Sequence, residues 1–75
     1  LTLGQTDNAL NQYVKATTLD PNRPEWQHNL AVLYLRTRQY DLAKKHFSIT
    51  LKLHPENQTT IYMLDALNGN LDVKA

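Results

Sequence analysis

A repeat with a period of 34 residues constrains the fold of this 75-residue chain more than any other feature. Sliding the sequence along itself by 34 positions gives eight identities among 41 aligned pairs, including Ala9 with Ala43 and Pro21 with Pro55. Ordinary composition would give about two or three. A fixed period of this length is typical of solenoids built from stacked units, so we predict that the chain is a piece of a repeat array.

In each copy of the repeat, a small residue precedes an aromatic residue by four positions, as in Ala9 with Tyr13 and Ala43 with Phe47. This spacing puts both side chains on one face of a helix. A neighbouring helix can then approach closely at the alanine while the ring fills the gap beside it. A proline follows each ring eight residues later. Because proline cannot continue a helix, both helices are predicted to end at the same phase of the period.

The segment 24–57 resembles the repeat unit of the tetratricopeptide family, which is a helix-turn-helix of 34 residues. The matching motifs are Leu-Ala-x2-Tyr at residues 30–34, Ala-x3-Phe at 43–47 and the closing Pro55. The resemblance implies an all-α fold. It would be an α-α superhelix in which helix-turn-helix repeats stack as a fragment of a right-handed solenoid.

The chain departs from the family pattern at a few positions. Gln27 stands where the family favours Trp, so we expect the neighbouring Trp26 ring at the edge of the helix contact. Arg38 stands where the inter-helix turn usually has Gly, and a positive φ would be strained there. Gly4 can fill that role in the preceding unit.

The pattern predicts that residues 1–75 form a single domain in three parts. Residues 1–23 are the end of a first repeat, residues 24–57 are a full repeat, and residues 58–75 are a capping helix or a partial third repeat. Asp65 falls in the slot for a small residue in the third unit. That unit is therefore expected to have lost the surface that receives a second helix.

Helix caps and apolar spacing predict helices over residues 7–19, 24–37, 40–53 and 57–68. Thr6 or Asp7 is the expected cap of the first of these. Asn57 or Gln58 is expected to open the last helix, and Gly69 is expected to end it in a left-handed conformation. Residues 1–4 would be the frayed end of a preceding helix. The side chains expected to face the core are Ala9, Leu10, Tyr13, Ala16 and Thr17, then Trp26, Leu30, Leu33, Tyr34 and Tyr40, and then Ala43, Phe47, Thr50 and Leu51.

Charge and composition exclude several kinds of partner. Eight Lys and Arg against seven Asp and Glu give a net charge of +1, which does not favour binding to a phosphate backbone. Most of the aromatic residues lie at positions expected to face the core, where they could not stack on bases, so we expect no nucleic acid partner. The longest apolar stretch is too short to span a membrane, and the first eight residues lack a secretory signal. The absence of cysteine leaves the compartment open, with the cytoplasm favoured.

The three histidines, His28, His46 and His54, lack the spacing that metal sites need, and no cysteine accompanies them. We therefore interpret them as surface or cap residues and expect neither a metal nor another cofactor. Ser48 has no histidine three or four residues away that could activate it. No catalytic residues are predicted, and we do not expect the chain to be an enzyme.

The resemblance also implies a binding surface, because the first helix of each tetratricopeptide unit lines a concave face where partner peptides bind. The residues predicted to line this groove are Glu25, His28, Asn29, Val32, Leu35, Arg36, Thr59, Tyr62, Met63 and Ala66. For Val32 and Leu35 an alternative stays open, which is that they pack between adjacent units. Only Asn29 matches the residues with which some members clamp a C-terminal carboxylate, so such a clamp is not expected.

The sequence therefore predicts a non-catalytic scaffold or adaptor that binds a protein or peptide on its concave helix face. A homo-oligomer formed by end-to-end stacking or helix exchange is also open, because the helix at residues 7–19 lacks most of its partner helix. An alternative is that the chain is the N-terminal module of a larger enzyme, such as an S-adenosylmethionine-dependent methyltransferase, and positions its substrate. This alternative rests on a resemblance of residues 54–69 to the last repeat of bacterial proteins of that kind.

Overall fold

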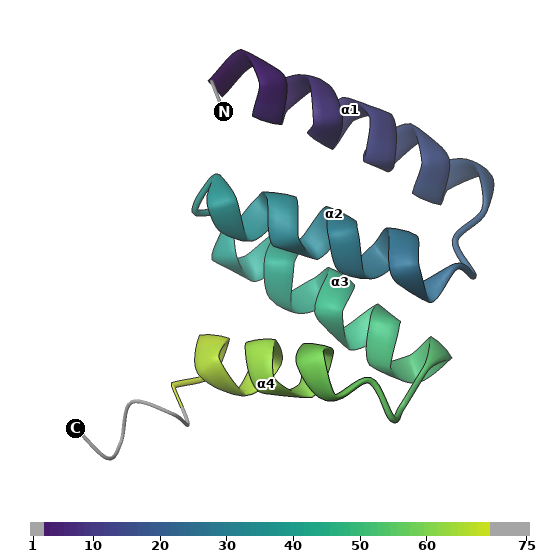
Figure 1. Cartoon of the computed structure of the whole chain (residues 1–75), viewed down its shortest axis with the longest axis vertical. Coiled ribbons are helices and arrows are strands. Elements are labelled where there is room, and N and C mark those ends of the chain that lie inside the picture. The colour runs from purple at the N-terminus through teal and green to yellow at the C-terminus, as the bar shows by residue number, and fades with distance from the viewer. Residues whose placement is uncertain (1–2, 70–75) are drawn as a thin grey trace.

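The structure is a computed structural model that describes residues 3–69, and it confirms the all-α fold. Helix α1 spans Leu3–Leu19, α2 spans Pro24–Arg36, α3 spans Tyr40–Leu53 and α4 spans Gln58–Leu67. Consecutive helices run antiparallel and stack in chain order, and the most extensive contact is between α2 and α3 (Figure 1). This arrangement agrees with tetratricopeptide-type helical repeats. The predicted division into repeat units stays a prediction, and residues 70–75 lie outside the described part of the chain.

The core lies where α2 crosses α3. Ala31, Ala43 and Phe47 have no exposed surface, as expected for Ala43 and Phe47. The two alanines let the helix backbones approach closely, and the Phe47 ring fills the space beside them. Apolar side chains from two helices complete the core around this cluster, and they are Val32, Tyr34 and Leu35 of α2 with Met63, Leu64 and Leu67 of α4.

The ends of α2 and α4 follow the sequence signals closely. Pro24 occupies the start of α2, where its fixed φ suits the helix and its missing N–H is not needed. The Asn57 side chain caps α4, because its Oδ1 accepts a hydrogen bond from the Thr60 backbone N–H at 3.0 Å. Gly69 follows α4 with a φ of 82°. The left-handed glycine was predicted, and Asn57 was one of the two residues expected to open this helix.

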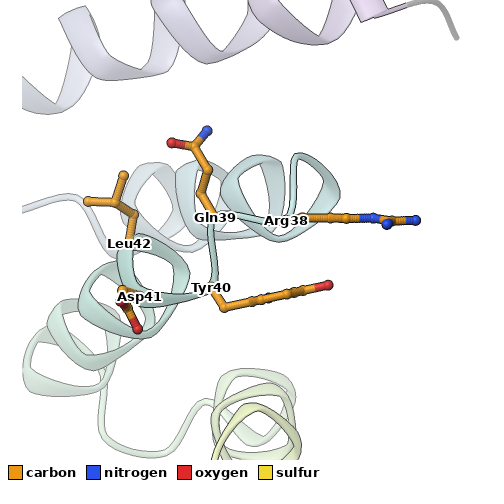
Figure 2. A pocket seen from close by; sticks show the side chains of 5 residues that line it. All are labelled: Arg38, Gln39, Tyr40, Asp41 and Leu42. Atoms are coloured by element: carbon orange, nitrogen blue, oxygen red, sulfur yellow. The ribbon is translucent and has the colours of Figure 1, made fainter.

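The turn between α2 and α3 contains the strained position that the sequence predicted. Arg38 has a φ of 63°, and it is the one non-glycine residue with positive φ among residues 3–69. Its backbone N–H donates to the Leu35 carbonyl at 3.0 Å. The expectation that Tyr40 faces the core is wrong, since its side chain is 48% exposed. Tyr40 is the first residue of α3 and extends past the end of the helix to the same side as Arg38 (Figure 2).

The predicted start of the first helix is also wrong. Helix α1 runs without interruption from Leu3, so Thr6 and Asp7 lie inside it, and Gly4 is helical rather than part of a turn. A glycine inside a helix costs only about 1 kcal/mol relative to alanine. Residues 1 and 2 lie outside the described part.

The buried stripe of α2 begins one residue later than predicted. The Gln27 side chain is 3% exposed, while Trp26 is only partly buried. The Arg23 guanidinium carbon lies 4.7 Å from the centroid of the Trp26 ring, a cation–π contact. The partial burial of Trp26 agrees with the expected place of its ring at the edge of the helix contact, but not with its membership in the core stripe.

Candidate binding surface

A hollow of about 240 Å³ lies between α1 and α2. Three of the ten predicted groove residues, Asn29, Val32 and Arg36, line it. The other lining residues are Ala9 and Tyr13 of α1 and Leu33 of α2. The hollow thus combines aliphatic side chains with the polar groups of Tyr13, Asn29 and Arg36, a mixture that suits recognition of a small apolar group flanked by polar ones.

Tyr13 was predicted to face the core, yet it belongs to this hollow. The Asn29 amide Nδ2 donates a hydrogen bond to the Tyr13 hydroxyl at 3.3 Å. The Tyr13 side chain is only partly buried, whereas its repeat equivalent Phe47 is fully buried. The substitution of Tyr for Phe at the same phase is the sequence signal that could have identified this residue, because a phenol hydroxyl favours a position that reaches water or a polar partner.

Arg36 supplies an available positive charge at the rim of the hollow. It lies in the last turn of α2, where a cation interacts favourably with the negative end of the helix dipole. Its side chain is exposed, and it belongs to neither of the ion pairs found in residues 3–69. An acidic group or a backbone carbonyl of a ligand could therefore accept hydrogen bonds from it.

The remaining predicted groove residues fall into two sets. Glu25 of α2 is exposed, and so are Thr59, Tyr62 and Ala66 of α4, with Tyr62 at 62%. Leu35 and Met63 are partly buried and pack against the core cluster, as Val32 of the hollow also does. His28 is also partly buried and contacts Phe47. Whether Val32 and Leu35 pack between adjacent units or line a groove stays open, because both side chains are partly buried against the core cluster and Val32 also lines the hollow.

Two of the three histidines are not the surface or cap residues that the sequence suggested. His46 of α3 places Nδ1 2.7 Å from Gln27 Oε1, and its ring stacks on Tyr34 with centroids 5.5 Å apart. His28 places Nδ1 2.7 Å from Thr60 Oγ1. Spacing along the sequence could not reveal these contacts because each joins two helices. His54, the C-cap residue of α3, is exposed as expected.

Burial sets the protonation of the two interior histidines. Desolvation lowers the pKa of His28 below its usual value, and it lowers the pKa of His46 in the same way. The positive charge of Lys45 lowers the His46 pKa further. Both rings are therefore neutral at pH 7, which suits hydrogen bonding inside the helix stack.

Two further hollows lie away from the predicted groove. One of about 390 Å³ surrounds the turn between α2 and α3 and is lined by residues 38–42, where Arg38 and Tyr40 extend outward (Figure 2). The other, of about 310 Å³, lies beside Val14, Lys15, Thr18 and Leu19 near the end of α1. Leu19 is 87% exposed.

Within residues 3–69, no group of three or more potential metal ligands comes together. None of the helices in the same part of the chain combines the length and the apolar character needed to cross a bilayer.

Comparison with known proteins agrees with the helix arrangement. Residues 2–37 match a family model described as TPR repeat. Tetratricopeptide repeat protein 6 of Homo sapiens is 36% identical over 56 residues, which cover 75% of this chain and 11% of that protein. Protein O-mannosyl-transferase TMTC4 of Mus musculus is 49% identical over 41 residues, which cover 55% of this chain and 6% of that protein. This chain thus spans a small part of the length of either relative. It belongs to the tetratricopeptide repeat family.

Proposed function

We propose that the chain is a non-catalytic scaffold module that binds a peptide segment of a partner protein across α2. Tetratricopeptide repeats serve in general as scaffolds for protein–protein interaction, and this coarse role follows from membership in the family. The finer proposal, a site on this particular face, rests on the hollow between α1 and α2 with its exposed Arg36.

The chemistry of the hollow indicates the kind of segment that it binds. Ala9, Val32 and Leu33 offer aliphatic surface for a small apolar side chain. Asn29 and Arg36 offer hydrogen-bond donors that can hold a backbone carbonyl or a carboxylate beside that side chain. Tyr62 adds an exposed aromatic ring on α4, the helix whose Thr60 contacts His28 of α2. An extended peptide with an acidic residue next to an aliphatic one fits these features.

Peptides selected from a random display library against the immobilised chain would test this proposal. Their affinity, measured by fluorescence anisotropy, should fall by about tenfold or more in Arg36→Glu because a favourable charge becomes repulsive. Tyr62→Ala should weaken binding by a smaller factor. Leu35→Glu is unsuitable because Leu35 packs against the core.

Lys52→Glu provides the matched control, since Lys52 is an exposed cation on α3 and lines none of the three hollows. It makes the same change of charge as Arg36→Glu and should leave affinity unchanged. The proposal fails if the selected peptides bind Arg36→Glu as tightly as the native chain, or if Lys52→Glu weakens them equally. Circular dichroism of each variant verifies that the helices are retained.

A second candidate is a positioning module within a larger enzyme. The observation in its favour is the similarity to a much longer protein that is named a transferase. A methyltransferase as the attached enzyme rests only on the sequence resemblance of residues 54–69. Sequencing the gene on both sides of the segment that encodes this chain tests this candidate, because a catalytic domain must be found in the same reading frame.

Self-association is a separate proposal that rests on the exposed Val14 and Leu19 side chains of α1. Light scattering at several concentrations tests it. The mass should rise with concentration in the native chain and remain that of a monomer in Leu19→Glu. A native chain that stays monomeric throughout would contradict self-association.

A further inference from the structure

The contact between His28 and Thr60 joins α2 to α4 through the interior of the helix stack. His28 Nδ1 lies 2.7 Å from Thr60 Oγ1. Thr60 has no exposed surface, and the His28 ring packs edge-to-face with the Phe47 ring of α3, with ring centroids 5.3 Å apart. This hydrogen bond therefore lies where three helices meet, and water does not reach the threonine side.

The hydrogen-bonding capacity of Thr60 determines which atom donates. The backbone N–H of Thr60 donates to the Asn57 side chain. Within residues 3–69, the one hydrogen bond of the Thr60 hydroxyl is with the His28 ring. If Nδ1 donated, the buried hydroxyl hydrogen would have no acceptor, which is costly. We therefore assign the hydroxyl as the donor and Nδ1 as the acceptor, so that the neutral ring carries its hydrogen on Nε2.

We propose that the His28–Thr60 hydrogen bond is a proton-sensitive latch that holds α4 on α2. A proton added at Nδ1 turns this atom into a donor. The hydroxyl must then accept, and its own hydrogen is left buried without a partner. Acid therefore loosens α4, whose Met63, Leu64 and Leu67 side chains help cover the core.

The surroundings of His28 determine the direction of the pH effect. The ring packs against Phe47 of α3 and forms a hydrogen bond with Thr60 of α4, and neither side chain is charged. The nearest acidic residue on α2 is Glu25, which is exposed. Burial lowers the pKa of His28, so the contact is fully formed above the ordinary histidine pKa. The contact weakens as the pH falls from the ordinary histidine pKa toward the lower pKa that His28 has while α4 is packed in the stack.

His46 differs from His28 in a way that confines the effect to α4. Gln27 Nε2 donates to the Pro21 carbonyl at 3.0 Å, so Gln27 Oε1 is the atom that accepts from His46 Nδ1. The neutral His46 ring already carries its hydrogen on Nδ1, and a second proton goes to Nε2. This leaves the bond to Gln27 intact, although Lys45 and burial oppose the charge. Tyr34 stacks on the His46 ring.

Amide hydrogen exchange of the whole chain, corrected for the intrinsic dependence of exchange on pH, tests the latch directly. Between pH 7.5 and 5.5 the opening equilibrium of residues 58–67 should rise between about twofold and tenfold, the upper limit applying if the closed state takes up no proton. Amides of α3 should change less. A uniform rise over all four helices would overturn the proposal, because it would indicate global unfolding rather than release of α4.

Variants separate the latch from other titrating groups. His28→Gln offers an oxygen that can accept from Thr60 but cannot be protonated, so the pH effect on α4 should disappear. His54→Gln is the matched control, since His54 is exposed, and it should retain the effect.

If His28→Gln does not fold, Thr60→Val removes the hydroxyl with little change of shape, and the pH effect should shrink. A full effect in His28→Gln or Thr60→Val would overturn the latch. The experiment uses the free chain, so its outcome is independent of peptide binding.

Discussion

Helices α1 and α3 have the same sequence pattern but different surroundings. Ala9 and Tyr13 of α1 correspond, across the 34-residue period, to Ala43 and Phe47 of α3. The α3 pair is fully buried, whereas the α1 pair is only partly buried. The reason is that α3 packs between α2 and α4, while in the described chain α1 packs extensively against α2 alone.

This difference shows that the repeat pattern specifies which face of a helix is apolar but not whether that face is covered. In α3 the pattern produces a closed core around Phe47. In α1 the same face forms one wall of the hollow that we propose as the peptide site. Substitutions at equivalent positions of the two helices should therefore have unequal effects.

The largest expected difference is between Phe47→Ala and Tyr13→Ala. Removing the fully buried Phe47 ring should lower the free energy of unfolding by about 3–5 kcal/mol. A domain of this size has about that much stability in total, so the variant should be largely unfolded. Tyr13→Ala should cost about 1–2 kcal/mol because less of the ring is removed from water. Urea unfolding followed by circular dichroism measures both, and equal losses would show that α1 is covered as completely as α3.

A smaller difference is expected when the two alanines are enlarged. Ala43→Leu should destabilise the chain by about 1–3 kcal/mol, because no space is left between α2 and α3. Ala9→Leu should change stability by less than about 0.5 kcal/mol, because the hollow between α1 and α2 receives the added methyl groups. Thermal unfolding of both variants provides the measurement. Comparable destabilisation by Ala9→Leu would mean that the hollow is closed in solution.

The smallest expected difference is between Gly4 and Arg38, which occupy the same position of the 34-residue period. Arg38→Gly should stabilise the chain by about 0.5–1 kcal/mol, because relief of the left-handed strain exceeds the entropy cost of glycine. Gly4→Ala should stabilise it by up to about 1 kcal/mol because Gly4 lies inside α1. Calorimetry of both variants sharpens the comparison. A loss of stability in Gly4→Ala would restore the interpretation of Gly4 as a turn residue with positive φ.

Local signals in the sequence predicted much of the fold. The Asn57 cap, the Pro24 start of α2, the left-handed Gly69 and the strained Arg38 depend only on residues a few positions away. The error at α1 arose because Gly4 has two possible roles. Which role it takes depends on whether another helix packs back onto α1, and the sequence of α1 does not contain that information.

The candidate site was predicted less completely, because its geometry joins separate helices. Asn29 and Arg36 were expected on the binding face and line the hollow, but their neighbour Tyr13 was assigned to the core. His28 was expected in the groove and instead contacts Thr60 and Phe47. The helical period gives the direction of each side chain from its own axis, and it does not say which neighbouring helix lies in that direction.

The sequence by itself determined the 34-residue repeat, the helical class, the family and most helix ends, because these depend on composition, spacing and local backbone preference. Tertiary structure decided which apolar faces are covered, which polar side chains pair inside the stack, and where the hollow lies. Burial and hydrogen bonding between helices depend on how the helices lie relative to one another. Residues as far apart in sequence as His28 and Thr60 can therefore form a single buried contact that neither local segment predicts.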